Sequence, residues 1–294
     1  MNPATDKLLL QFKALADPVR TRLVALCGLA ECSVSELTQV TGQSQPRISQ
    51  HVKQLCDVSL LERFKDGHFV YYRVPSSGKE SSSRRKLLAL LPENEPQFSK
   101  DAAKLRETRA AGGNIAAPVS ESDRSLHRAL VELTVSRPLG DLLDIGCGQG
   151  RILKLLASRA HRAVGVDNDS GARKFARAEL LLAGTPNATL RQGDMAALPF
   201  DDNEFDTIIL DDVLSDAKDP AAAIAEARRL LRPDGRILLL ASVGDADISE
   251  LSARFSKWAV AAELRLAAPR SVPNKKPAWL LAVATNTDPA AAAA

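Results

Sequence analysis

The sequence is poor in the residues that mark several common classes of protein. Phe, Trp and Tyr together make up only 4% of the 294 residues, and there are four histidines and four cysteines. No CxxC pair occurs, which argues against a disulfide framework and favours a reducing, cytoplasmic location. No run of eighteen apolar residues exists, so the sequence predicts no membrane span. The first eighteen residues carry charges on both sides of a short apolar run, and we interpret them as a helix rather than a signal peptide.

The length and the apolar content allow two globular domains. Apolar residues make up 45% of the chain, which is enough for buried cores. The net charge of +3 is unevenly distributed, because residues 1–111 hold 17 Lys and Arg against 12 Asp and Glu, and the remainder holds 22 against 24. A basic front half favours contact with nucleic acid there, although chance variation on a solvated surface explains the same numbers equally well.

The front of the chain predicts a series of short helices. Apolar residues recur at helical spacing over 7–30, and Asp17-Pro18 divides this stretch, with Asp17 as the N-cap and Pro18 as the first helical residue. A third short helix is expected to end at Gly42, since glycine commonly follows the last turn of a helix.

A further helix and a strand pair follow. The segment SQPRISQHVKQLCDVS (44–59) predicts a helix with Ser44 as its N-cap and one apolar face. The segment LLERFKDGHFVYYRV (60–74) alternates like two strands around Asp66-Gly67, which is a strong hairpin-turn dipeptide. Helix, tight turn, helix and β-wing is the order of a winged helix-turn-helix, in which the second helix enters the major groove of DNA.

Polar side chains gather at the start of that second helix, where they would face base edges. Arginine can bind guanine and glutamine can bind adenine, and each well-made pair contributes about 1–3 kcal/mol of discrimination. Lys53 is expected to hold a phosphate, and the wing residues are expected to reach the backbone or the minor groove. A surface helix with ordinary polar residues is the alternative, which the attached wing disfavours. The candidate DNA-binding residues are Ser44, Gln45, Arg47, Ser49, Gln50, Lys53, Lys65 and His68.

Four blocks of this half, in order and at the expected spacing, resemble the ArsR/SmtB family of bacterial repressors. They are LADPVRTRLVALC, ECSVSEL, TGQSQPRISQHVKQL and GHFVYYRV, and they span roughly residues 8–76. The resemblance implies a homodimer that binds a near-palindromic operator, usually as a repressor that an effector releases.

The metal-binding positions of that family are not filled in this sequence. Arsenic-sensing members place two cysteines around the valine of the ECSVSEL block, whereas Ser33 and Ser35 stand there and Cys32 is one position away. Hydroxyl groups are poor ligands for soft metals, and residues 76–126 contain no histidine for the other metal site of the family. We therefore expect no metal, interpret the cysteines of this half as small buried apolar residues, and expect the effector to bind elsewhere.

The pattern changes in the second half of the chain. The segment SSGKESSSRRK (76–86) is typical of a loosely ordered break, and helical pieces follow it up to Gly112-Gly113. From about residue 121 strands and helices alternate, which predicts an α/β doubly wound sheet. The expected strands are 140–145, 162–167, 188–192, 206–211, 236–241, 264–268 and 279–284.

A turn with three glycines on alternate positions, LLDIGCGQG (142–150), connects the first of these strands to a helix. Glycine lets the backbone approach a ligand closely. The next strand ends in Asp167, where a carboxylate can bind both hydroxyls of a ribose. The third strand ends near Asp194 and Met195, which offer an acceptor for an adenine amine and an apolar contact. The spacing DxGxGxG differs from the dinucleotide GxGxxG, and this disfavours NAD(P).

Together these segments resemble a class I S-adenosylmethionine-dependent methyltransferase. The similar blocks are DIGCGQG, VGVD, QGDMAALPF, FDTIILDDVL and ARRLLRPDGRILLL, within about residues 121–285. The resemblance implies S-adenosylmethionine or S-adenosylhomocysteine as the ligand; a cofactor-free domain with these residues as turns and caps is the alternative. It places Asp144, Gly146, Gly148 and Gly150 at the methionine part of the ligand, Asp211 near the same end, Asp167 at the ribose, and Asn168, Asp194 and Met195 at the adenine.

The expected fold class is α/β, with a mainly helical winged helix-turn-helix followed by a Rossmann-like, seven-stranded methyltransferase domain. The expected divisions are a DNA-binding domain over 1–78, a helical linker and possible dimer interface over 79–120, the methyltransferase-like domain over 121–287, and a disordered tail over 288–294.

Two functions remain open at this level. The favoured one is a DNA-binding repressor whose effector is the adenosyl ligand, because some ArsR-type regulators with methyltransferase-like domains are associated with the methionine cycle and this chain resembles them. The alternative is an active methyltransferase on a small-molecule acceptor. Its candidate bases are His127, Asp211, Asp212 and Asp216, for which loop acids and a capping histidine are the plainer interpretation, so no catalytic residue is assigned. The expected partners are operator DNA, the adenosyl ligand and a second copy of the chain.

Overall fold

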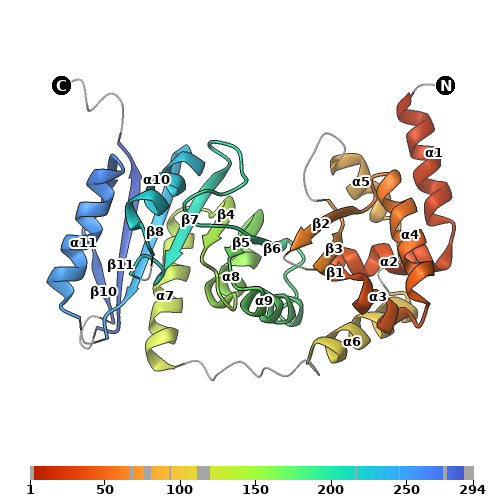
Figure 1. The fold of residues 1–294 in the computed structure, drawn as a ribbon, viewed down its shortest axis with the longest axis horizontal. Coiled ribbons are helices and arrows are strands. Elements are labelled where there is room, and N and C mark those ends of the chain that lie inside the picture. Colours follow the sequence, from red (N-terminus) through yellow and green to blue (C-terminus); the bar gives the residue numbers. More distant parts are fainter. Residues whose placement is uncertain are drawn as a thin grey trace. The chain divides into compact units, whose positions relative to one another are not determined.

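The chain folds into two compact units in a computed structural model (Figure 1). The first unit comprises Met1–Ile115 with Arg177–Pro186, and the second comprises Ala116–Ala176 with Asn187–Ala294. His68 and the tail expected over 288–294 lie outside the described residues. The structure describes residues 3–66, 69–75, 81–92, 94–110, 120–215, 217–244, 246–273 and 277–287.

The first unit is mainly helical with a small antiparallel sheet. Its elements are α1 (Pro3–Leu15), α2 (Pro18–Leu29), β1 (Cys32–Ser33), α3 (Val34–Thr41), α4 (Gln45–Asp57), β2 (Glu62–Asp66), β3 (Phe69–Arg73), α5 (Ser81–Leu88) and α6 (Pro96–Ala110). The sheet has the order β1-β3-β2, and β2 and β3 form the expected wing. The expectation of a loosely ordered break over 76–86 is wrong for residues 81–86, which belong to α5, and its first five residues lie outside the described residues.

Local sequence signals determine the ends of these helices. The Asp17 carboxylate caps α2 by accepting hydrogen bonds from the backbone N–H groups of Val19 and Arg20, at 2.9 and 3.0 Å. A reciprocal capping box joins Ser33 and Glu36 at the start of α3, and that helix ends at Gly42, whose φ of +71° is left-handed. These caps fix the turn between α3 and α4, and therefore the direction in which α4 leaves it.

One apolar core holds the helices and the wing of the first unit together. Leu37 of α3 and Ile48 and Leu55 of α4 are fully buried, and Leu105 of α6 is buried in the same core. An ion pair between Arg22 of α2 and Asp101 of α6, with both N–O distances at 2.7 Å, adds a polar contact to this packing. The α6 helix is thus packed on the helix-turn-helix rather than separated from it.

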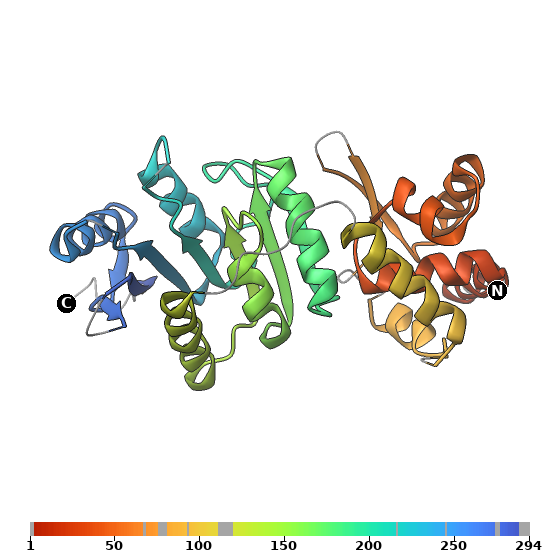
Figure 2. The same ribbon diagram turned by 90° about the horizontal axis from the view of Figure 1, so that it is seen from below.

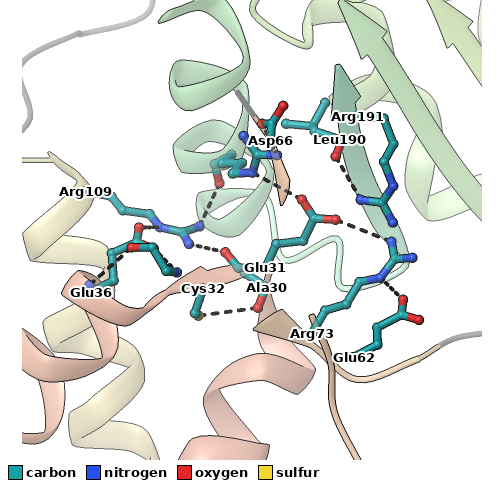
Figure 3. Close-up of polar contacts among 12 residues, drawn as sticks. Ala30, Glu31, Cys32, Glu36, Glu62, Asp66, Arg73, Arg109, Leu190 and Arg191 are labelled. Carbon is teal, nitrogen blue, oxygen red and sulfur yellow. Dashed lines mark hydrogen bonds and ion pairs between the residues drawn. The ribbon is translucent and has the colours of Figure 1, made fainter. Parts of the chain in front are cut away.

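A buried group of charged residues connects the wing to the rest of the first unit through ion pairs and hydrogen bonds (Figure 3). The Arg177 guanidinium contacts the carboxylates of Glu31 and Asp66 at 3.1 and 2.6 Å, and lies over the ring of Tyr71. Arg109 of α6 donates to the backbone oxygens of Arg177 and Glu31, at 3.0 and 2.7 Å. We call Glu31, Asp66, Arg109 and Arg177 the wing cluster.

The second unit contains a predominantly parallel sheet with helices on both faces. Its elements are α7 (Glu121–Ser136), β4 (Asp141–Ile145), α8 (Arg151–Leu156), the 3-10 turn η1 (Ala157–Arg159), β5 (Arg162–Asp167), α9 (Ser170–Leu182), β6 (Ala188–Gln192), β7 (Phe205–Asp211), α10 (Pro220–Leu230), β8 (Leu231–Ser242), α11 (Ile248–Ala261), β9 (Leu264–Leu266), β10 (Arg270–Val272) and β11 (Trp279–Asn286). The helix α9 crosses the division between the units, because Arg177 and the residues after it belong to the first.

The strand order confirms the expected fold class. The sheet runs β10-β11-β8-β7-β4-β5-β6, with β9 paired to β11, and β4 to β8 pair in parallel in this order. All seven expected strands are present, and the three-residue β10 makes an eighth that the sequence analysis missed. In Figure 2, α7 and α10 lie on opposite faces of the sheet. The carboxyl ends of β4, β5 and β7 therefore share one edge, where the glycine turn lies.

Candidate functional site

The polar residues expected to contact DNA lie on one exposed side of α4. Ser44, Gln45, Arg47, Ser49, Gln50 and Lys53 are all exposed, whereas the apolar residues between them pack into the core. Ser44 is the N-cap of α4, but its side chain makes no capping hydrogen bond. A hydroxyl and an amide at the start of a helix, with a guanidinium two positions later, give this surface the donors and acceptors that major-groove base edges require.

The wing adds a second basic surface. Lys65 is exposed on β2, and Arg63, two positions earlier on the same side of the strand, is exposed as well. The sequence analysis missed Arg63, although the period of two in the strand places it beside Lys65. His68 lies outside the described residues, so the expectation for it stays a prediction.

The cysteines of the first unit are part of its packing. Cys27 and Cys32 are buried, and Cys56 is half-buried. Burial raises the pKa of the Cys56 thiol to about 11, which keeps it protonated at neutral pH. In the described part of the chain, no group of three or more His, Cys, Asp and Glu side chains could hold a metal ion. No described helix is both long and apolar enough to cross a membrane.

Two glycines of the turn after β4 have left-handed backbone conformations, and one of them borders open space. Gly146 has a φ of +73°, and a side chain there would meet Val213 at 2.4 Å. Gly148 also has a left-handed φ of +50°, but a side chain there would meet no atom within 4 Å, so it borders open space. The N–H groups of Gly146 and Cys147 donate to the backbone oxygen of Val166, at 2.7 and 2.9 Å, which ties the turn to β5.

Asp167 stands at the end of β5 against this turn. Its carboxylate accepts hydrogen bonds from the backbone N–H groups of Gly148 and Asp169, both at 2.8 Å. The fully buried Arg173 donates from its guanidinium to the backbone oxygen of Asp167 at 2.7 Å. Arg173 therefore positions the backbone that carries the carboxylate, and Asp167 remains half-buried at the sheet edge.

A cavity of about 200 Å³ opens beside Asp167 and Gly146. The structure brings four of the expected ligand residues together in its wall, namely Gly146, Asp167, Asn168 and Met195. The rest of the wall consists of Ile145, Val166, Gly193, Asp212 and Val213. It combines two carboxylates and an amide with apolar side chains and two glycines, which suits a nucleoside with a polar sugar and a flat base.

Asp194 lies outside the wall of this cavity. Its side chain is exposed, and its carboxylate accepts a hydrogen bond from the Ala196 N–H at 3.0 Å, as in an Asx turn. The neighbouring Met195 is half-buried and packs against the core. The structure thus places Met195, rather than Asp194, in the cavity wall.

Asp144 is buried beneath the glycine turn with an unsatisfied oxygen. It is 1% exposed, and among the described residues its Oδ1 has no hydrogen-bond partner. Burial raises the pKa of Asp144 well above its ordinary value, and the nearby carboxylates of Asp211 and Asp167 act in the same direction. In its protonated form Asp144 can donate a hydrogen bond as well as accept one.

Asp211, at the end of β7, is bound by Arg151. The Arg151 guanidinium lies 2.8 and 3.1 Å from the two Asp211 oxygens, and its other terminal nitrogen lies 3.0 Å from Asp123 of α7. The guanidinium also lies over the ring of Trp279, 4.7 Å from its centroid. Burial raises the pKa of Asp211 from its ordinary value, while Arg151 opposes this rise.

Arg151 and Arg173 were not among the residues predicted from the sequence. Arg151 is the first residue of α8, where a positive charge is unfavourable beside the helix dipole, and this was a signal that it has a carboxylate partner nearby. Arg173 carries no comparable signal, because an arginine on a helix is normally read as a surface residue.

The candidate bases differ in their hydrogen-bond partners. The Asp212 carboxylate accepts hydrogen bonds from the backbone N–H and the hydroxyl of Ser242, at 3.0 and 2.6 Å, and Asp216 lies outside the described residues. His127 is half-buried, and its Nε2 has no partner among the described residues. Burial and the charge of Arg151 lower the pKa of His127, so its imidazole is neutral at neutral pH.

An adenosyl ligand fits these residues. The cavity offers two carboxylates and an amide for a nucleoside, and the glycine turn borders open space at Gly148. Among the described residues, the buried Oδ1 of Asp144 has no hydrogen-bond partner and could bind a polar group of the ligand. Gly150 and Asp211 lie at the same sheet edge but outside the cavity wall.

Two parts of the chain match known protein families. Residues 17–62 match the family described as "Bacterial regulatory protein, arsR family", and residues 143–239 match the family described as "Methyltransferase domain". The first match covers α2 to the start of β2, and the second covers β4 to β8.

Curated relatives and solved structures are similar over part of the chain. The nocamycin O-methyltransferase of Saccharothrix syringae is 35% identical over 130 residues, which cover 43% of this chain and 46% of that protein. The "Probable S-adenosylmethionine-dependent methyltransferase" of Mycolicibacterium smegmatis is 32% identical over 114 residues, covering 38% and 42%. The chain thus spans less than half the length of these relatives. The N-methyltransferase NodS of Bradyrhizobium japonicum, solved with S-adenosyl-l-homocysteine, has a TM-score of 0.48 at 19% identity and covers 57% of this chain and 89% of its own.

Proposed function

We propose that this chain, which joins an arsR-type helix-turn-helix to a methyltransferase domain, is a transcriptional repressor whose effector is S-adenosylmethionine or S-adenosylhomocysteine. One observation carries the proposal: a chain whose arsR-type half exposes the polar side of α4 also holds a cavity of about 200 Å³ lined by Asp167, Asn168 and Met195. The arsR-type half has serines where metal-sensing members have cysteines, so the signal must come from another ligand.

Each half of the proposal assigns roles to residues of this chain. On the DNA side, Arg47 and Gln50 of α4 read base edges, and Lys53 and Lys65 bind phosphates. On the ligand side, the Asp167 carboxylate accepts from the ribose hydroxyls, and Met195 packs against the adenine. The glycine turn, Asp144 and Asp211 bind the methionine part.

The helix α9 offers a physical route between the two activities. It begins at Ser170, three residues after Asp167, and it carries Arg177 into the wing cluster, where the guanidinium contacts Asp66 of β2. A ligand shifts a conformational equilibrium only if it binds one state better than the other. We propose that the ligand changes the position of α9 and that Arg177 transmits this change to the wing.

A second copy of the chain is the proposed partner on DNA. Leu8, Leu9, Leu10 and Phe12 of α1 expose 40–54% of their surface, which is an unusual concentration of large apolar side chains on one helix. Pairing two such helices would bury them and present two α4 helices to the two halves of an operator.

Operator binding with and without the ligand tests the proposed function. A duplex would be selected from random sequences by repeated binding to the full chain, and its dissociation constant measured in the absence and presence of each adenosyl ligand. We expect at least one ligand to change this constant tenfold or more. Asp167→Ala should abolish the change and leave ligand-free operator binding intact, with the exposed Asp234→Ala as the matched control. An operator affinity that neither ligand changes would overturn the sensor function.

Methyl transfer is the second candidate, because the nocamycin relative is named as an O-methyltransferase and His127 has a free ring nitrogen. When bound, S-adenosylmethionine supplies an electrophilic methyl group. A neutral His127 could accept the proton of an acceptor hydroxyl. Formation of S-adenosylhomocysteine in the presence of a hydroxylated acceptor, lost in His127→Ala, would support this function.

A further inference from the structure

Arg151 is held by three separate elements of the second unit. Its two terminal nitrogens contact Asp123 of α7 and Asp211 of β7, and its planar group stacks on Trp279 of β11. The side chain is 34% exposed, whereas that of Asp211 is 15% exposed. Two carboxylates and an aromatic ring restrict the movement of this guanidinium, so its positive charge stays in one position.

The Arg151 guanidinium lies at the edge of the sheet where the glycine turn is. The proposed function assigns this place to the methionine part of the ligand. Arg151 directly follows Gly150, the last residue of the glycine turn. Asp211 and Trp279 lie on the face of the sheet that α7 covers. Asp211 pairs in register with Leu240, and Leu240 lies on the same face of β8 as Arg236. Arg236 donates to the backbone oxygen of Leu133 in α7, which places this face under α7.

The two possible ligands differ in charge at one atom. In S-adenosylmethionine the sulfur is a sulfonium and carries a positive charge, whereas in S-adenosylhomocysteine it is an uncharged thioether. The remainder of the two molecules is the same. A site that separates them must therefore respond to one positive charge and one methyl group at the sulfur.

Carboxylates near a sulfur-binding site favour the sulfonium, and a nearby cation disfavours it. Asp144 lies under the glycine turn and Asp211 lies beside it, so two acids could attract a sulfonium at this end. The Arg151 guanidinium donates to a carboxylate oxygen of Asp211 at 2.8 Å and so compensates the charge of Asp211. The other acid, Asp144, is 1% exposed, and its burial together with the charge of Asp211 raises its pKa, although the charge of Arg151 opposes this rise.

We propose that Arg151 is the residue that determines how this site discriminates between the sulfonium and the thioether ligand. By compensating Asp211 it removes the attraction for a sulfonium, so that S-adenosylhomocysteine binds at least as tightly as S-adenosylmethionine. This inference rests on the proposed function, because it presupposes that an adenosyl ligand binds at the glycine turn.

Titration calorimetry of both ligands against the full chain tests the proposal. The measured quantity is the ratio of the dissociation constant of S-adenosylmethionine to that of S-adenosylhomocysteine. Arg151→Met keeps much of the apolar stem and removes the charge, and we expect it to lower this ratio at least tenfold. Arg151→Lys keeps the charge and should hold the ratio within about threefold of the wild-type value. The exposed Arg128→Met, on α7, is the matched control for loss of one arginine.

Asp211→Asn tests the direction in which the ratio of the two dissociation constants changes. It removes the carboxylate but leaves the guanidinium, so the ratio should rise, opposite to the change in Arg151→Met. Opposite signs identify charge as the cause, because a general loss of shape would weaken both ligands alike. If Arg151→Met leaves the ratio unchanged, or weakens both ligands by the same factor, the proposal is overturned.

The result also separates this inference from the proposed function. If wild-type protein binds neither ligand, the proposed function itself fails. If both ligands bind and Arg151→Met leaves their ratio unchanged, only the role of Arg151 is wrong.

Discussion

At the scale of single residues, Asp144 shows how burial sets the chemistry of the glycine turn. Its carboxyl group is 1% exposed, and burial raises its pKa well above the ordinary value. A carboxyl group whose pKa is higher in the folded than in the unfolded protein binds more protons when folded, at any pH between the two values. Stability therefore falls as the pH rises through that interval.

We expect Asp144→Asn to remove this dependence on pH. Its stability relative to the wild type should increase with pH above about pH 4, by about 1.4 kcal/mol per pH unit until the pKa of the folded state is reached. Denaturant unfolding of the second unit between pH 4 and pH 8 measures this difference, with the exposed Asp234→Asn as the control. A stability difference that is the same at every pH would show that Asp144 is ionised in the folded protein.

Arg47 and Lys53 provide a second prediction at this scale. Both are exposed on α4, and they should affect DNA binding in different ways. Arg47→Ala should cost about 1–3 kcal/mol on the operator and relax the preference at one base pair, whereas Lys53→Ala should weaken all duplexes alike and reduce the salt dependence. Operator titrations at several salt concentrations check this, with Lys104→Ala on α6 as the control. Equal losses on operator and random DNA for Arg47→Ala would contradict base readout by this residue.

The role of a residue could be predicted from the sequence when its partners lie close to it along the chain. The cap at Asp17 involves partners two and three residues away, and it could be read from the sequence. Arg151 has partners 28, 60 and 128 positions away, at Asp123, Asp211 and Trp279, and only the fold brings them together.

At the scale of elements, the sequence predicted seven strands of the second unit and missed the three-residue β10. The strands β4, β5 and β7 each contain a run of four buried residues, as parallel strands covered on both faces require. The strand β10 has only three residues and exists because β11 offers an edge to pair with. The helix α6 shows the same limit, because its spacing predicts a helix but not the contact of Asp101 with Arg22.

The wing cluster makes α9 the element whose alteration should matter most for regulation. Arg177 is 5% exposed and contacts Glu31 and Asp66, so Arg177→Met leaves both carboxylates without that guanidinium. We expect the first unit to lose about 3–5 kcal/mol of stability, since this is typical when one partner of a buried ion pair is removed. We also expect the effect of the adenosyl ligand on operator binding to decrease while the ligand still binds.

Lys174→Met, an exposed change on the same helix, is the control for this prediction. Denaturant unfolding measures the stability, and operator titration with and without ligand measures the response. A variant that remains folded and responds to the ligand as the wild type does would show that Arg177 does not transmit the signal.

At the scale of the whole molecule, the central claim is that one chain couples two binding events. The sequence predicted both halves, because each has its own motifs, but motifs do not describe coupling. Coupling is reciprocal by thermodynamic necessity: if the ligand changes operator affinity by a given factor, the operator must change ligand affinity by the same factor. A tenfold factor corresponds to about 1.4 kcal/mol per site.

The most direct test is therefore the affinity of the adenosyl ligand for the full chain when it is free and when it is saturated with operator duplex. Titration calorimetry gives both dissociation constants for each ligand in the same buffer. We predict that they differ tenfold or more for at least one ligand, and that Asp167→Ala removes the binding signal in both states. If each ligand binds with the same dissociation constant in the two states, the two halves are not coupled and the chain is not an adenosyl-responsive repressor.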